Sequence, residues 1–338
     1  MVAKVFLGEE DRPSEPETLY KVKEVSDVHD TVEDHIPVLL CHQTVTNPTS
    51  SIREALDFLE PTKGSRVYIL VFPKLSPITK LHGDDLFNVW RRCMLGHIIL
   101  WKVGVYHQDV SPGNMMWYYD KLGKLMGVLN DYDLSSLADE SGPQGNERTG
   151  TVPFMAIDLL TERAQRGEVK HLYRHDMESF VWVFIWICFR YDSKGALLSP
   201  SSRRFDEWAT LGAFQCRKDK RDFLHDITDF PRPNVGRRTW RLLTQCAWVL
   251  KKDLDRLSDQ KYDQLIEAYD QSDDDEEEKD EHENANEDEV KVEESVDGLP
   301  GAVKQPEDET SIAAIEAFLR MFTETKGWKE LERRIRSR

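Results

Sequence analysis

Residues 107–114, "HQDVSPGN", bring together side chains that could transfer a proton and bind a cation. Asp109 follows His107 by two residues and precedes Asn114 by five. An aspartate within reach of a hydroxyl group can orient it and accept its proton. The amide oxygen of an asparagine suits Mg²⁺, a hard cation that takes oxygen ligands. By itself this spacing is a modest signal, and its meaning depends on the segments that follow it.

Three downstream segments extend the pattern in a consistent order. "NDYDL" places Asp131 at the end of an expected strand, where a carboxylate could bind a metal ion. "GTVPFMAID" follows at residues 150–158, and "YRHDMESF" places Asp176 at the start of a strongly hydrophobic helix. Four such segments in this order are far harder to obtain by chance than one.

Together these segments resemble the fungal-type protein kinase family, for which "RTGTVPFMAIDLL", "HLYRHDMESFVWV" and "SEPE" are characteristic. The first segment is close to the kinase catalytic-loop pattern H-R-D-x-x-x-x-N, with Gln108 in place of the arginine. The resemblance covers roughly residues 2–270. It implies an α+β, two-lobed protein-kinase-like fold, with a truncated strand-rich N-terminal lobe and a mainly helical C-terminal lobe. It also implies ATP and Mg²⁺ as cofactors and a protein hydroxyl as the phosphoryl acceptor.

The same resemblance implies a role for each candidate residue. Asp109 would orient the acceptor hydroxyl and take its proton, with Asn114 beside it in the catalytic loop. Asn114 and Asp131 would hold Mg²⁺, and Asp131 would also belong to the nucleotide site. Lys4, in "VAK", would contact the α- and β-phosphates. Phosphoryl transfer depends on such positioning and charge neutralisation, because its transition state spreads negative charge over the phosphoryl oxygens.

Two further candidates are expected near Lys4. Its helix partner is Glu15 or Glu17, and the choice is loose. Glu17 together with Ser14 fits a capping box at the start of a helix, so we expect Glu15 to pair with Lys4. Val71, near the end of the strand-like run "SRVYILVF", is the remaining candidate for nucleotide binding.

The sequence also departs from the kinase pattern. Ser111 stands where serine/threonine kinases carry a lysine two residues after the base, and Asp133 stands where a glycine is usual. Lys4 lies so near the first residue that the two strands and the Gly-rich loop expected before it are absent from the sequence. The chain is therefore either a truncated reading of a longer gene or a degraded kinase.

Three functions remain open. The leading hypothesis is an ATP-dependent protein serine/threonine kinase, because Asp109, Asn114 and Asp131 are all present. The second is a pseudokinase, a scaffold module, which the missing N-terminal strands favour. The third is a small-molecule phosphotransferase, which needs no catalytic-loop lysine. The well-formed "GTVPFMAID" substrate-docking segment weighs against the third.

The neutral side chain of Gln108 indicates that the activation loop is ordered without a phosphate. In many kinases the arginine at this position receives a phosphate on the activation loop, and a neutral amide cannot neutralise such a group. We expect the loop to be ordered instead by packing around Phe154 and Met155. Thr151 is expected beside the catalytic aspartate rather than as a phosphorylation site.

Composition limits the partners and the surroundings of the chain. The formal charge is -17, of which residues 271–295 contribute -12 through fourteen acids and two lysines, leaving -5 elsewhere. We expect no nucleic-acid or membrane partner, and the oligomeric state stays open. The five cysteines have no CxxC spacing and the N-terminus has no apolar signal core, so we expect an intracellular protein, cytoplasmic or nuclear.

Hydrophobic periodicity predicts the elements that position these residues. Strands are expected over 2–7, 35–41 and 65–72, a helix over 84–103, and a buried core helix containing the apolar run 180–189. The expected organisation is a partial N-terminal lobe over 1–81 and a catalytic lobe over 82–270. A disordered acidic insertion over 271–307 and a last helical segment over 308–338 complete it.

Overall fold

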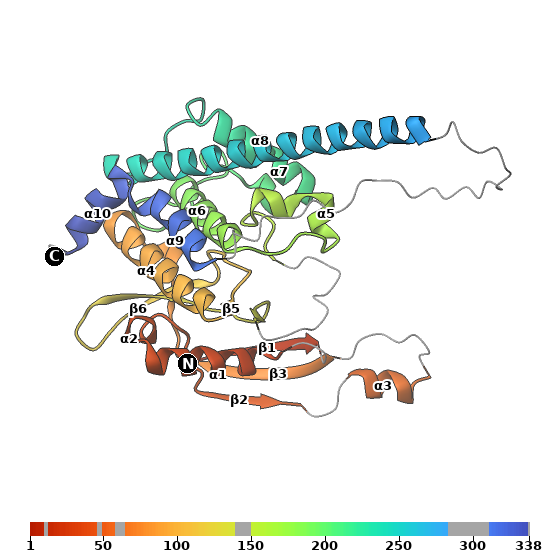
Figure 1. Ribbon diagram of the computed structural model, residues 1–338. Coiled ribbons are helices and arrows are strands. Elements are labelled where there is room, and N and C mark those ends of the chain that lie inside the picture. The colour runs from red at the N-terminus through yellow and green to blue at the C-terminus, as the bar shows by residue number, and fades with distance from the viewer. Residues whose placement is uncertain (10–12, 46–48, 58–64, 139–149, 283–310, 337–338) are drawn as a thin grey trace.

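The computed structural model describes the chain except for residues 10–12, 46–48, 58–64, 139–149, 283–310 and 337–338. A strand-rich part holds the N-terminus, and a larger helical part lies against it (Figure 1). The expected α+β class is therefore confirmed. The remainder of the predicted acidic insertion, 283–307, lies outside the described residues.

The strand-rich part is an antiparallel sheet in the order β1-β3-β2, formed by β1 (Val2–Glu9), β3 (Ser65–Phe72) and β2 (Cys41–Thr44). Helix α1 (Glu15–Val28) begins after Ser14, whose N–H and hydroxyl both donate to Glu17 at 2.7 and 2.9 Å. Because side chains alternate along a strand, one face of the sheet is apolar and packs against α1. The buried side chains of this core include Leu19, Val22, Tyr68, Leu70 and Phe72. Short helices α2 (Asp30–Glu33) and α3 (Thr49–Ala55) complete this part.

The strand predicted over 35–41 is wrong in position, because β2 begins only at Cys41. Pro37 has no N–H to give to a neighbouring strand. Ile36 is instead buried among the core residues beneath the sheet. Pairing starts at Leu40, whose N–H donates to the carbonyl of Val71 at 2.9 Å.

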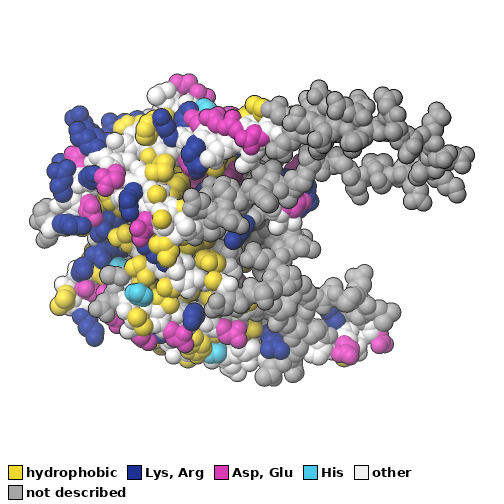
Figure 2. Space-filling model, in the orientation of Figure 1, with side chains coloured by type: hydrophobic (Ala, Val, Ile, Leu, Met, Phe, Trp, Pro, Cys, Tyr) yellow, Lys and Arg dark blue, Asp and Glu magenta, His cyan; other side chains and the backbone are white. Residues whose placement is uncertain are grey.

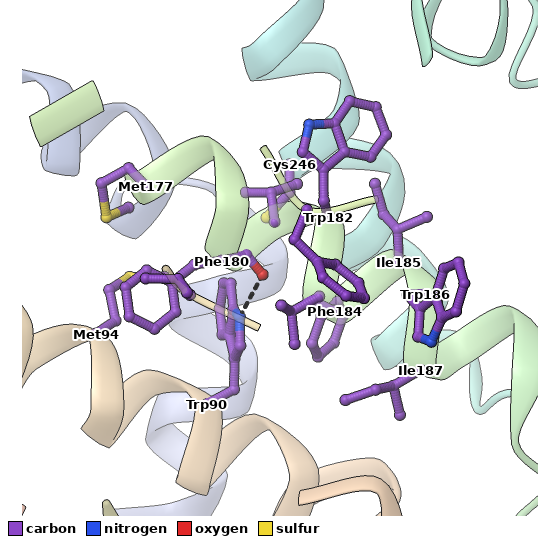
Figure 3. Packing of buried hydrophobic residues seen from close by; sticks show 14 of the residues in the cluster. Trp90, Met94, Met177, Phe180, Trp182, Phe184, Ile185, Trp186, Ile187 and Cys246 are labelled. Carbon is purple, nitrogen blue, oxygen red and sulfur yellow. Dashed lines mark hydrogen bonds between the residues drawn. The ribbon is translucent and has the colours of Figure 1, made fainter. Parts of the chain in front are cut away.

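The helical part is built around α6 (Tyr173–Arg190) and α4 (Gly83–Lys102). Helix α6 is buried on every side, as expected of a helix that is apolar all round. Trp90 of α4 donates its indole N–H to the carbonyl of Phe180 at 2.7 Å, and aromatic and aliphatic side chains from both helices surround this contact (Figure 3). The predicted core helix containing 180–189 is confirmed. No helix of the described residues is long and apolar enough to cross a membrane.

The remaining helices cover this core: α5 (Glu162–Gln165), α7 (Ala213–His225), α8 (Arg237–His282), α9 (Ile312–Thr323), α10 (Lys326–Arg336) and the 3₁₀ helices over Ile78–Lys80, Ile157–Leu160 and Glu207–Ala209. Helix α8 is the long helix that projects beyond the body (Figure 1). It continues past Asp270, which corrects the predicted start of the disordered insertion. Glu, Gln and Lys are good helix formers, and extending a helix costs far less than starting one.

The last helical segment is divided in two. Helix α9 ends at Thr323 and α10 begins at Lys326, with the Thr325 hydroxyl donating to the carbonyl of Phe322 at 2.7 Å. Trp328 of α10 then packs against Trp90 with ring centroids 5.5 Å apart. The C-terminal segment therefore belongs to the same core as α4 and α6.

Short strands carry the candidate residues between the two parts. The segment after α4 forms β5 (Val105–Tyr106), which pairs with β8 (Ser136–Leu137). A hairpin follows, formed by β6 (Met115–Tyr119) and β7 (Leu125–Leu129), with β4 (Ser76–Pro77) at its side. The side chains of Leu100, Val105 and Tyr132 join the core beneath the β1-β3-β2 sheet, so the two parts share buried surface.

Candidate active site

The β6–β7 hairpin places Asn114 and Asp131 next to each other. Asn114 directly precedes β6, and Asp131 follows β7 by two residues. The antiparallel register pairs Met115 with Leu129. One residue beyond this pair, the N–H of Asn130 donates to the carbonyl of Asn114 at 2.7 Å. Two residues that are well separated in sequence thus meet at one end of the hairpin.

Asp109 is held from two directions. The side-chain amide of Asn114 donates to its Oδ2 at 3.0 Å and to its carbonyl at 2.9 Å. The N–H and hydroxyl of Thr151 donate to its Oδ1 at 3.0 and 2.9 Å. Thr151 therefore lies beside the aspartate, as the sequence predicts. Because Asn114 uses its amide nitrogen here, its amide oxygen can serve as a ligand for a cation.

Lys4, on strand β1, contacts Asp131, a candidate metal ligand. Its Nζ lies 2.6 Å from Glu15 Oε2 and 2.6 Å from Asp131 Oδ1. Of the two possible helix partners, Glu15 makes the contact and Glu17 caps the helix. Burial disfavours the charge on Lys4, but Glu15 and Asp131 outweigh burial and raise the pKa of Lys4. Lys4 is therefore a retained positive charge between two carboxylates.

Glu15 is the more deeply buried member of this pair. Its side chain is 1% exposed, against 27% for Lys4, and its Oε1 accepts from the N–H of Tyr132 at 3.1 Å. Burial raises the pKa of Glu15 despite the neighbouring Lys4. The pairing thus favours the charged form of Lys4, whereas desolvation works against the charged form of Glu15. The contact through Tyr132 also ties α1 to the turn that carries Asp131.

Two residues of the site adopt a left-handed backbone. Gln108 has φ 66° and Asp131 has φ 68°, a region that costs free energy for residues other than glycine. Gln108 is held there by its N–H, which donates to Asp176 at 3.2 Å, and by its amide, which donates to the Ser136 hydroxyl at 2.9 Å. Such strain persists only where the surroundings fix the conformation.

Asp176 holds the loop that carries Asp109, by accepting the N–H of Gln108. His97 and His171 bring their Nε2 atoms within 2.8 and 2.7 Å of its two oxygens. Burial alone would raise the pKa of Asp176, but the two histidines hold it well below its usual value. His175, in the first turn of α6, also makes a hydrogen bond, with its Nδ1 accepting from the N–H of Leu172 at 3.1 Å.

His107 has a structural position in the loop. It is 1% exposed, and its ring packs edge-on against Tyr132. Its Nε2 donates to the carbonyl of Asn130 at 3.0 Å, while Nδ1 accepts from the N–H of Asp109 at 3.3 Å. These contacts require the neutral ring, and burial lowers the pKa of His107.

The segment after Thr151 is ordered by buried groups that the sequence reasoning missed. Glu178 Oε1 accepts from the N–H of Ile157 and from the indole N–H of Trp182, both at 2.8 Å. Lys220 donates to the carbonyl of Met155 from a fully buried position. The sequence signal for the first contact was a glutamate two residues before the apolar run 180–189, on a helix expected to be buried. No sequence signal pointed to Lys220, because its burial depends on how α7 packs.

Packing of the same segment matches the expectation for an unphosphorylated loop. Phe154 and Met155 are buried, and Phe154 lies edge-on to Trp186 at 5.2 Å. Asp158 pairs with Arg174 at 2.7 Å and with Lys261 at 3.3 Å, and these partners lower its pKa against the effect of burial. Residues 139–149 of the loop lie outside the described residues.

The structure does not bring Val71 to this cluster. Lys4 is paired with Leu70, so these two side chains share the sheet face that packs against α1. Val71 is the next residue along β3 and therefore points to the opposite face. Both faces of β3 carry apolar residues, so the sequence pattern does not indicate which of them shares the face of Lys4.

The oxygen donors fit a magnesium ion. Asn114 and Asp131 offer an amide oxygen and a carboxylate at one end of the hairpin. Within the described ranges, no group of three or more His, Cys, Asp and Glu side chains could form an all-protein metal site. Mg²⁺ commonly takes only one or two protein ligands and completes its shell with water and phosphate oxygens. The donor set therefore suits Mg²⁺ bound with a nucleotide.

Comparisons with known proteins found one family and one solved structure similar to this chain. Residues 67–188 match the model of the family described as fungal protein kinase. The solved structure of the Cydia pomonella granulovirus kinase PK-1 is similar over 72% of this chain and 77% of the viral chain, with 13% identity and a TM-score of 0.43. No curated protein matches the sequence. The stretch over 67–188 is therefore similar to fungal protein kinases.

Proposed function

We propose that the chain is a protein serine/threonine kinase that transfers the γ-phosphate of ATP with Mg²⁺. The observation that carries the proposal is the contact of Lys4 with both Glu15 and Asp131, each at 2.6 Å. A lysine paired with a helix glutamate and adjacent to a metal-binding aspartate is the arrangement that protein kinases use to position the nucleotide.

Each residue then has a distinct task. Asp109 orients the acceptor hydroxyl and accepts its proton, and Thr151 fixes one of its two oxygens. Lys4 neutralises phosphate charge, and buried Glu15 holds Lys4 in place. Asn114 and Asp131 supply oxygens for Mg²⁺. When bound, the ion neutralises charge on the phosphates.

Acceptor specificity is the part of the proposal that separates a protein kinase from a small-molecule phosphotransferase. The segment around Phe154 and Met155 is buried and fixed through Glu178 and Lys220, which gives a rigid surface beside Asp109 for a peptide. The Ser111 position has no lysine to contact the transferred phosphate. Asp109, Lys4 and the ion would carry that step without it.

The test combines nucleotide binding with product analysis. We expect ATP to raise the melting temperature in the presence of Mg²⁺ and to lose this effect in EDTA, with Asn114→Ala and Asp131→Ala also insensitive. Incubation with labelled ATP and a mixture of acceptor proteins should give phosphoserine or phosphothreonine on acid hydrolysis. Equal stabilisation by ATP in EDTA, or none at all, would refute the enzyme and favour a scaffold. Label found only in small molecules would instead favour the small-molecule phosphotransferase.

A further inference from the structure

A cavity of about 610 Å³ lies between α4, α9 and the β6–β7 hairpin, and no candidate active-site residue lines it. Its floor follows α4 from Arg91 to Lys102. At about 1.5 Å per residue this stretch is roughly 16 Å long. Figure 2 shows hydrophobic side chains on this face of the molecule, flanked by lysines and arginines. The cavity is therefore elongated and has both apolar and cationic walls.

The centre of the cavity is apolar. Leu95 and Ile99 contribute from α4, Met126 from β7 and Leu319 from α9. Leu95, Ile99 and Leu319 are only partly buried, so their side chains remain accessible from the cavity. An apolar side chain entering it would gain about 25 cal/mol for each Å² of apolar surface removed from water.

One end of the cavity is cationic. Arg92 and Lys124 both line it and both lie near His35. Arg92 contacts the Asn88 amide oxygen at 3.1 Å and His35 Nε2 at 3.5 Å. Across the part of the chain that the structure describes, no carboxylate forms an ion pair with Arg92 or Lys124. Asp34 is the only carboxylate among the described residues lining this end, so its charge is net positive.

Arg91 also lines the cavity. Its side chain is 14% exposed, and its NH1 lies 3.4 Å from Glu332 of α10. Its Nε is buried and has no hydrogen-bond partner among the described residues. A buried donor without a partner costs free energy, so a ligand oxygen that reached it would be favoured.

The cations at the opposite end share a carboxylate. Glu316 of α9 lies 2.5 Å from Lys102 and 3.4 Å from Arg320. Both of these cations therefore have an ion-pair partner, whereas Arg92 and Lys124 at the first end have none among the described residues. The cavity therefore has a direction, with anion-binding capacity at one end and apolar contact in the middle.

We propose that this cavity docks an acidic, amphipathic segment of a partner protein. Carboxylates of the segment lie against Arg92 and Lys124, and leucine-like side chains that follow them enter the apolar centre. A length of roughly 16 Å accommodates about five residues of extended peptide. Charge complementarity selects this occupant, because an apolar segment would leave the cations unpaired and a small anion would leave the centre empty. The proposal goes beyond phosphoryl transfer and holds whether or not the chain is catalytic.

The experiment measures binding of a defined probe to the full chain. The probe is a fluorescein-labelled ten-residue peptide with three glutamates followed by alternating leucines, and its control peptide has lysines in place of the glutamates. Fluorescence anisotropy should show saturable binding of the acidic peptide only, weakening as salt is added. Lys124→Glu should weaken binding roughly tenfold. Lys121→Glu, in the same hairpin but outside the cavity, should leave binding unchanged.

A second cavity variant and a catalytically impaired variant serve as controls. Leu319→Lys replaces an apolar contact in the centre of the cavity with a charge and should also weaken binding. Circular dichroism checks that each variant is folded. Asp109→Asn should bind the peptide like wild type, so a failure of catalysis does not count against the docking site. Equal weakening by Lys124→Glu and Lys121→Glu, or no saturable binding to wild type below about 1 mM, would overturn the proposal.

Discussion

Asp176 and Glu178 are buried carboxyl groups two residues apart on α6, and they hold two different loops. Asp176 binds the catalytic loop through the N–H of Gln108. Glu178 binds the segment after Thr151 through the N–H of Ile157. The same helix thus positions both the proposed base and the proposed substrate surface.

The two groups differ in how their charge is compensated. The two histidines of Asp176 overcome burial and hold its pKa well below the usual range. Burial dominates for Glu178 and raises its pKa to about 7, even with Lys220 nearby. Burial in turn lowers the pKa of Lys220 to about 8. The loop that carries Asp109 is therefore held by a fixed charge, whereas the segment after Thr151 is held by groups whose pKa values lie near neutral pH.

The largest expected effect is that of removing the fixed charge. Asp176→Ala would leave His97, His171 and the N–H of Gln108 without their shared acceptor in a dry interior. Removing one partner of such a buried network typically costs about 3–5 kcal/mol. We expect the free energy of unfolding, measured by urea denaturation, to fall by that amount. Asp176→Asn is the control and should lose less, since it keeps one acceptor. A loss below about 1 kcal/mol for Asp176→Ala would contradict the assignment.

The second effect is the contribution of Glu178 to the pH dependence of stability, which a comparison with Glu178→Gln isolates. Its pKa is about 7 in the folded chain, against 4.5 as its ordinary value. Between these pH values the folded protein keeps a proton that the unfolded chain releases, so the stabilising contribution falls as pH rises. Relative to Glu178→Gln, the wild type should lose roughly 1–3 kcal/mol of unfolding free energy between pH 4.5 and 7.5. Parallel pH profiles for the two proteins would show that Glu178 does not titrate in this range.

Gln108 gives a smaller effect, on regulation rather than stability. Its amide donates to the Ser136 hydroxyl, and it offers no positive charge to a loop phosphate. Phosphatase treatment of the purified protein should therefore change phosphotransfer by less than about twofold. The matched variant is Gln108→Arg, which could gain sensitivity to loop phosphorylation. A strong loss of wild-type activity after dephosphorylation would disprove this prediction.

The smallest effect is expected for the acidic segment. Deleting residues 271–295 removes fourteen acids and two lysines and few apolar side chains. The melting temperature should change by no more than about 2 °C, because ordinary surface changes alter stability by about 0.5 kcal/mol or less. Differential scanning calorimetry of the deletion variant against wild type is the measurement. A large drop would show that the segment packs against the folded core.

The sequence predicts most of the candidate site, because the patterns that indicate these residues are local in the sequence. The spacing of Asp109 and Asn114, the position of Asp131 after a strand and the hydrophobic run of α6 all hold in the structure. Capping chemistry also separates Glu17 from Glu15, and the structure pairs Glu15 with Lys4.

Features that depend on three-dimensional packing were not predictable in this way. The face on which Val71 lies follows from the strand register, and the start of β2 follows from competition between pairing and the burial of Ile36. The burial of Lys220 and the walls of the cavity around Leu95 arise from helices that are distant in sequence. Periodicity predicts that such helices exist but not which side chains they enclose together.

The central claim is that Asp109, fixed by Asn114 and Thr151, acts as the base for phosphoryl transfer. The most direct test is the single-turnover rate of transfer from labelled ATP in wild type and in Asp109→Asn, with both proteins shown to melt at the same temperature. Losing a positioned base should slow transfer by about 10²–10⁴ while ATP binding is retained. An unchanged rate in Asp109→Asn would contradict the account.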